Sequence, residues 1–240
     1  GVIGGLLSGR LSTALHVGTI KPKFLRNTKS FYLLSKAGAV LTLETSVAMS
    51  LVAVLFGIVL RGATVADLIP ILGVITATMA LALVVVSPLT MFVSFISYKH
   101  GLDPDIILYP VESTVSDVLI TLCYVAILSL YFLANTVGYL VIILLCGVLT
   151  TSVMYFLYRN WKEIEFAKTM KESFLTTVCV AFIVNITGSV LGQMREAIRG
   201  KREVYTVYPA LIDTIGDVGA VIGSTAVSYT HLRAHETGRN

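Results

Sequence analysis

The chain has 240 residues, of which 55% are hydrophobic and only 13% are charged. This composition lies outside the range of soluble globular domains. The formal net charge of +4 comes from Lys and Arg between apolar runs, which is typical of a membrane protein and gives no reason to expect a nucleic-acid partner. We therefore expect an all-α fold, a polytopic bundle of transmembrane helices that contacts the lipid bilayer.

Apolar runs long enough to cross a bilayer, which takes about 20 residues, follow one another along the chain. They predict membrane helices over residues 1–17, 33–60, 66–98, 106–133, 137–158, 173–194 and 208–228. The third range exceeds the bilayer thickness and contains Pro88, so it should tilt or bend there. Asn135 and Gly138 predict a very short turn. The mixed-charge loop 159–171, with Trp161 as an anchor, should lie at the membrane interface.

The two ends of the chain look atypical. Residue 1 is not Met, and the sequence is apolar from the start, so we interpret the chain as a fragment. Residues 229–240 turn abruptly polar and are interpreted as a non-native tail. The Lys and Arg count over alternate loops predicts that loops 18–30, 98–105 and 159–171 are cytoplasmic.

Acidic residues inside the predicted spans are the main functional signal. A carboxylate at the bilayer centre costs about 2.5–3.5 kcal/mol on insertion scales, so such residues usually face a bundle interior, a water-filled path or a cation. The fourth span carries Glu112 and Asp117, and on a helix Asp117 lies on the same face as Ser113. The last span carries Asp213 and Asp217, which are four residues apart and share a face. These residues predict a cation path.

Other titratable groups give weaker signals. Glu44 lies within the second span, where it supports the path, caps a helix or meets Lys36. The three cysteines lie in apolar runs without a metal-ligand spacing, and are interpreted as buried free thiols: Cys123, Cys146 and Cys179.

The segments GLDPDIILYPVESTVSDV and YPALIDTIGDVGAVIGS resemble the two signature helices of the MgtE magnesium channel family and of its two-repeat relatives, the solute carrier family 41 transporters. The resemblance implies that Asp117 matches the aspartate of the main magnesium site. Pro209, Gly216 and Gly219 match the second signature helix, whereas Asp217 replaces the usual Asn. Asp217 therefore adds negative charge at a position that is usually neutral.

The resemblance also implies a domain organisation. Residues 1–135 would form a first MgtE-like repeat that is incomplete at its start, and 136–171 a linking helix with an interfacial loop. Residues 172–228 would begin a second, truncated repeat. GVIGGLLSG near the start and GDVGAVIGS near the end share a small-residue pattern that supports a duplication. The chain would then be pseudo-dimeric, and it could also form a homo-oligomer.

The implied function is transport of divalent cations, most simply Mg²⁺ as the transported ion, through a multi-pass protein of a prokaryotic plasma membrane. Asp117, Asp213, Asp217 and Glu112 are the candidate metal-binding residues, with Asp103 and Asp105 at the mouth. Two alternatives stay open. One is a proton- or sodium-coupled transporter of another cation or small solute. The other is an intramembrane aspartic protease, although the residues around Asp117 and Asp217 do not fit protease motifs, so we expect no enzyme.

Overall fold

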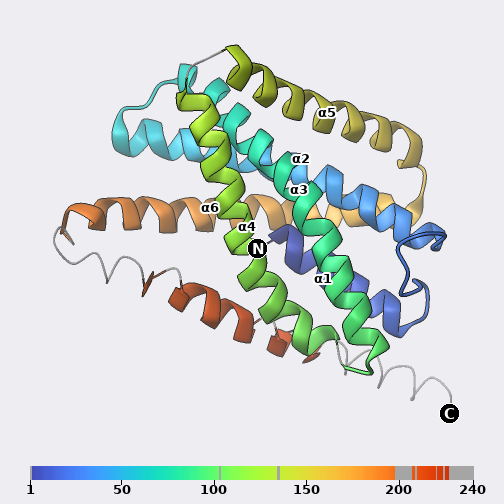
Figure 1. Cartoon of the computed structure of the whole chain (residues 1–240). Coiled ribbons are helices and arrows are strands. Elements are labelled where there is room, and N and C mark those ends of the chain that lie inside the picture. The colour runs from blue at the N-terminus through green and yellow to red at the C-terminus, as the bar shows by residue number, and fades with distance from the viewer. Residues whose placement is uncertain are drawn as a thin grey trace.

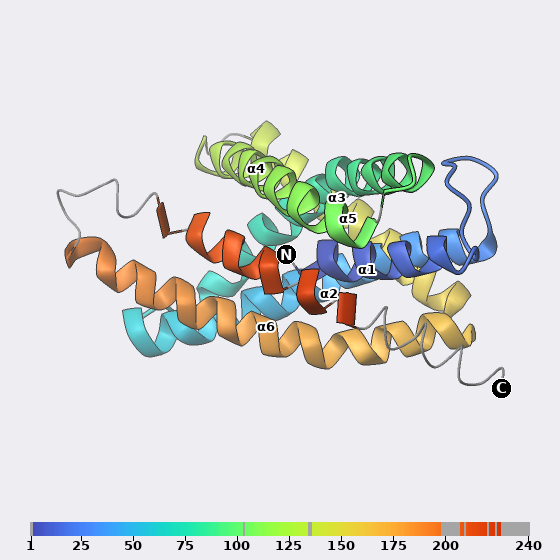
Figure 2. The same cartoon turned by 90° about the horizontal axis from the view of Figure 1, so that it is seen from below.

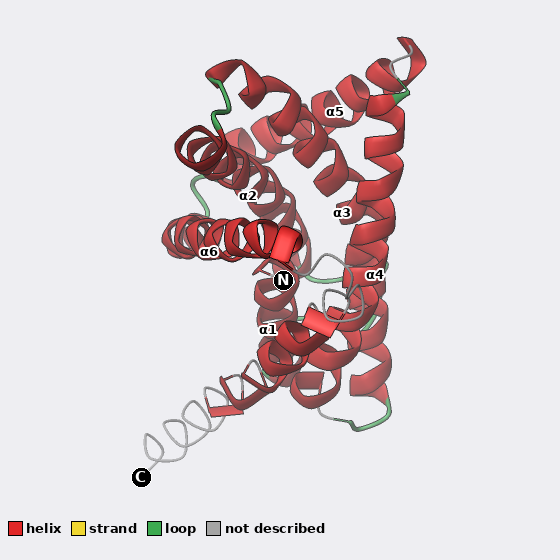
Figure 3. Cartoon of the chain, turned by 90° about the vertical axis from the view of Figure 1, so that its left-hand side faces the viewer, coloured by secondary structure: helices red, strands yellow, loops and turns green. Residues whose placement is uncertain are grey.

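In the computed structural model the described residues are 2–102, 104–133, 136–197, 207–208, 210–219, 221–223 and 225–226, with side chains not described at 2–8, 104–112 and 195–197. This part of the chain is helical apart from short connections, and contains no strand (Figures 1 and 3). The helices are α1 (Val2–His16), α2 (Lys29–Arg61), α3 (Leu68–Lys99), α4 (Pro104–Phe132), α5 (Thr136–Asn160) and α6 (Ile164–Ala197), with a 3-10 turn, η1 (Val65–Asp67), before α3. The described parts of 207–226 are also helical.

Five of these helices are long and apolar enough to cross a membrane. The candidate spans are Lys29–Arg61, Val65–Lys99, Ser113–Phe132, Thr136–Asn160 and Ile164–Met194. They fall on five of the predicted ranges, so the prediction of an all-α, polytopic bundle is confirmed. Inside a bilayer, helices are favoured because they satisfy every backbone hydrogen bond within the segment.

Local signals set the ends of α2 and the start of α3. The Thr28 hydroxyl accepts a hydrogen bond from the backbone N–H of Phe31, which caps α2 at its N-terminus. Gly62 ends the helix with a φ of 69°, in the left-handed region that glycine adopts at low cost. Asp67 then accepts hydrogen bonds from the backbone N–H and the hydroxyl of Thr64, which fixes the turn into α3.

Three clusters of buried side chains hold the helices together. The first joins α2 and α5 to α6 and includes Phe166, which is almost fully buried. The second joins α1, α2 and α3 through Leu15 and Phe95. The third joins α3, α4 and α5 around Ala77, which has no exposed surface. A small residue at this position lets neighbouring helices approach closely, and close packing drives helix association in lipid.

The connections predicted to share one membrane face do lie at one end of the bundle. The rings of His16, at the end of α1, and Tyr98, near the end of α3, pack edge to face with 6.1 Å between centroids. Lys29 Nζ, at the start of α2, lies 2.8 Å from Oε1 of Glu163, in the turn before α6. Consequently α2 and α6 start at the same end and run parallel (Figure 2).

The loop predicted over 159–171 is helical over most of its length. Helix α6 begins at Ile164, so the span predicted to begin at residue 173 starts earlier. Phe166 and Met170 are buried in the first cluster, and the Thr169 and Ser173 hydroxyls donate to carbonyls one turn earlier. The charged residues of this stretch occupy the other faces of a helix that continues through the predicted loop.

Two smaller predictions concern Pro88 and the turn before the fifth span. Pro88 lies inside α3, which is a single helix from Leu68 to Lys99, and the tilt or bend expected there stays a prediction. Gly138 belongs to α5, which begins at Thr136, whereas Asn135, the other residue of the predicted turn, lies outside the described residues.

Replacing Ala77 by Leu should destabilise the bundle, because the larger side chain would clash with Ile127 and Ile142 in the third cluster. Overpacking of this kind costs about 1–3 kcal/mol. The measurement is the temperature at which heating the protein in detergent removes half of its monodisperse size-exclusion peak. We expect this temperature to be lower for the variant than for the wild type. Ala126→Leu on the exposed face of α4 is the matched control, and equal effects of the two changes would contradict the assigned packing.

Candidate cation site

The two acid-bearing spans meet in the structure. The Ser113 hydroxyl on α4 donates a hydrogen bond of 2.7 Å to Oδ1 of Asp213 on the helical segment 207–226. The same hydroxyl lies within hydrogen-bonding reach of the Asp217 carboxylate. Because a hydroxyl has one proton, it can donate to only one of these carboxylates at a time. Ser113 therefore lies between two acids contributed by a different helix.

Asp117 completes the group from α4. Asp213 and Asp217 both lie close enough to its carboxyl group to interact with it electrostatically. Asp117 lies one helical turn beyond Ser113, and Asp217 one turn beyond Asp213. Two successive turns of α4 therefore face two successive turns of the 207–226 segment. Figure 2 shows the 207–226 segment, in red, between α4 and α6.

The arrangement gathers negative charge and oxygen ligands on facing helix surfaces. Asp213 and Asp217 are partly buried, and Asp117 is exposed. Like charges at this separation repel each other in a medium of low polarity, so a cation between them is strongly favoured. Within the described part of the chain, no group of three or more His, Cys, Asp or Glu side chains has the close geometry of direct metal coordination. Mg²⁺ sites do not require such a group, because this ion usually keeps several of its waters and binds through one or two carboxylates.

Three of the four predicted metal-binding residues therefore come together: Asp117, Asp213 and Asp217. The fourth, Glu112, belongs to α4, but its side chain lies outside the described residues, as does that of Asp105. Asp103 also lies outside them.

Glu44 belongs to a different part of the molecule. It lines a groove formed by α2, α5 and α6, and no residue of the 207–226 segment contributes to that groove. The suggested Lys36 partner is engaged elsewhere, because its ammonium donates to the Asn160 amide oxygen at 3.2 Å. A role for Glu44 in the same cation path is therefore not supported by its position.

An ion pair that the sequence did not predict ties α1 to α6. The Arg10 guanidinium donates to the Thr169 hydroxyl at 2.6 Å and to the Glu172 carboxylate at 2.9 Å. Thr169 and the first turns of α6 fall within the loop predicted over 159–171, so the sequence did not indicate this partner. Arg10 and Glu172 lie more than 150 residues apart, and no local pattern pairs them.

Comparison with known proteins identifies the family. The family model described as MgtE, divalent cation transporter, matches residues 1–127, which is more than half of the chain. The match runs from α1 to the last turns of α4 and includes Ser113 and Asp117. No curated protein and no solved structure matches the chain. Together with the apolar helices, the family match makes this a multi-pass membrane protein that belongs to the MgtE family of divalent cation transporters.

Proposed function

We propose that the protein transports Mg²⁺, and that the ion passes between α4 and the helical segment 207–226. The observation that carries this proposal is the meeting of Asp117, Ser113 and Asp213 from two separate helices. Facing acids in a helix bundle make a cation-selective passage without a dedicated cofactor. Mg²⁺ is the transported substrate and has no catalytic role.

Asp117 is the proposed anchor of the ion, with Asp213 and Asp217 on the opposite wall. Mg²⁺ demands near-ideal octahedral oxygen geometry and loses its waters reluctantly. A wall of separated carboxylates can hold the hydrated ion through its waters, and weak outer contacts also let the ion leave. Ser113 positions the Asp213 carboxylate, because its hydroxyl donates to that group across the helix contact. Glu112, Asp103 and Asp105 would attract cations at the mouth.

The proposed organisation has two repeats. Residues 1–135 form the first, 136–171 link the two, and 172–228 begin the second, so that one chain supplies both walls of the path. Supporting this, α1 and the 207–226 segment occupy related positions: α1 packs against α4, and the segment contacts α4 through Ser113. Such a protein would act in the plasma membrane, as expected of an uptake system in a prokaryotic cell.

A coupled transporter of another cation remains the second candidate, because the same carboxylates can bind other divalent ions. Flux into proteoliposomes separates the two. Uptake of Mg²⁺ that exceeds that of Mn²⁺, Co²⁺ and Zn²⁺ at equal concentrations, and that persists without a proton or sodium gradient, is the expected result. Uptake that requires either gradient, or that prefers another ion, would contradict passive Mg²⁺ transport.

Replacing Asp117 by Asn should lower the initial rate of Mg²⁺ uptake in proteoliposomes by at least about tenfold, since interactions with a charged group in a site of this kind contribute about 1.5–3 kcal/mol. The same variant should fail to rescue growth of a magnesium-uptake-deficient strain. Glu163→Gln, an acid in the connection before α6 and away from the path, should keep wild-type uptake. Undiminished rescue by the Asp117 variant would refute the assigned role.

The Ser113 contact gives a test of the helix arrangement. In a chain whose native cysteines are replaced by Ala, cysteines at Ser113 and Asp213 should be joined by a short bifunctional thiol reagent. A protease site is inserted within 198–206, and the protein is cleaved there after the reaction. Linked fragments then run together on a denaturing gel, whereas unlinked fragments separate. Ile215, two residues further along, lies on the opposite side of the helical segment from Asp213 and is exposed, so the 113 and 215 pair is the control. Equal linking of both pairs would show that this face of the segment does not meet α4.

A further inference from the structure

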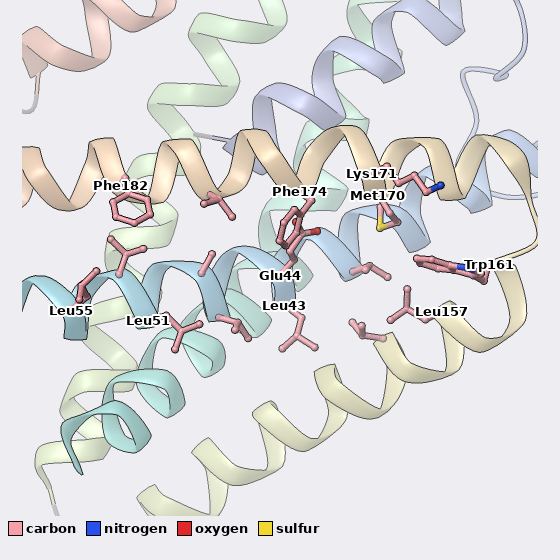
Figure 4. A pocket seen from close by; sticks show the side chains of 16 residues that line it. Leu43, Glu44, Leu51, Leu55, Leu157, Trp161, Met170, Lys171, Phe174 and Phe182 are labelled. Carbon is pink, nitrogen blue, oxygen red and sulfur yellow. The ribbon is translucent and has the colours of Figure 1, made fainter. Parts of the chain in front are cut away.

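A concave site lies between helices that carry none of the three aspartates. Helices α2, α5 and α6 enclose a groove of about 850 Å³, which is the size of a pocket for a small organic molecule (Figure 4). Its walls are almost entirely apolar, and the lining residues Leu51, Leu55 and Phe174 are exposed. The groove is therefore open toward the lipid, and a ligand could enter it from the bilayer.

Glu44 is the acidic side chain on this apolar wall. It lies 15 residues beyond Lys29, the first residue of α2, which places it about 22 Å along a helix whose other end is at Arg61, near the middle of the span. Its Oε1 atom is buried and has no hydrogen-bond partner among the described residues. No Lys or Arg in the described part of the chain forms an ion pair with it.

This arrangement narrows the choice of occupant. A carboxylate near the bilayer centre is costly without a partner. A lipid acyl chain fills apolar space but offers no hydrogen-bond donor or positive charge. A lipophilic cation supplies both the apolar bulk for the groove and the charge for Glu44. Aromatic rings add a second attraction, because the face of Phe or Trp attracts cations; Phe174 lines the same groove as Glu44.

We propose that the groove between α2, α5 and α6 binds a lipophilic organic cation, with Glu44 as its counter-charge. The positions of the other charged and apolar residues orient the ligand. Lys171 and Trp161 lie toward one end of the groove, and Leu55 and Phe182 toward the other (Figure 4). Repulsion by the Lys171 ammonium disfavours the cation at its end. The charged group therefore lies at Glu44, and the apolar body extends toward Leu55 and Phe182.

The test uses the purified protein in phosphatidylcholine nanodiscs that contain a phospholipid with a photoreactive diazirine in its acyl chain. Illumination labels side chains in contact with lipid, and mass spectrometry locates the label. Tetraphenylphosphonium is the cationic probe. We expect lipid labelling of the groove at Leu51 and Phe174, and its displacement by tetraphenylphosphonium. The displacement should need at least about tenfold more probe in Glu44→Gln and remain close to wild type in Glu44→Asp.

Two controls keep the result interpretable. Label on Val84, an exposed residue of α3, should not respond to the probe, and its persistence in each variant shows that the bundle is folded. Glu172→Gln removes an acid that does not line the groove, and should leave displacement unchanged.

Three outcomes would overturn the proposal. If the probe displaces the lipid label equally well in wild type and Glu44→Gln, Glu44 is not the counter-charge. If the probe cannot displace the lipid label, the occupant of the groove is an acyl chain. Absence of label in the groove, with Val84 labelled, would mean that protein covers this face.

Discussion

The free energy of placing a carboxylate in hydrocarbon is the constraint on which the functional reading of this molecule depends. At about 2.5–3.5 kcal/mol per group, each acid in a span needs a compensating contact. Asp117, Asp213 and Asp217 meet one another across two helices, and under the proposed function a cation between them would offset both the burial and the mutual repulsion. Glu44 has no such neighbours, and this contrast separates the two sites in chemistry as well as in position.

Helix packing brings the acids to these positions. The hydrophobic effect does not drive helices together within lipid. Small buried residues such as Ala77 and specific polar contacts therefore determine which helices pack together. The Arg10 contact with Thr169 and Glu172 joins α1 to α6, and Lys29 with Glu163 joins the start of α2 to the same region. Such exposed ion pairs contribute little stability individually, but they fix which ends of the helices lie together.

The sequence predicted those features that depend on local composition. Apolar length alone located the helices within a few residues, apart from the start of α6, since a span must satisfy its own backbone. The four-residue spacing of Asp213 and Asp217 predicted their shared face, and that face does meet α4 at Ser113. The start of α6 was missed because charged residues between 159 and 171 looked like a loop, whereas Phe166 and Met170 pack into the core. Long-range partners such as Glu172 for Arg10, and the groove around Glu44, depend on how helices pack, which no local pattern contains.

The most direct measurement of the central claim is the position of a divalent ion relative to the three aspartates. Mn²⁺ can replace Mg²⁺ in crystals of the protein and is located by its anomalous scattering. The account predicts a peak between α4 and the 207–226 segment, close to Asp117 and Asp213 but further from their oxygens than the direct Mg–O bond of about 2.0–2.1 Å. A peak bonded directly to residues elsewhere, with none between these two helices, would contradict it.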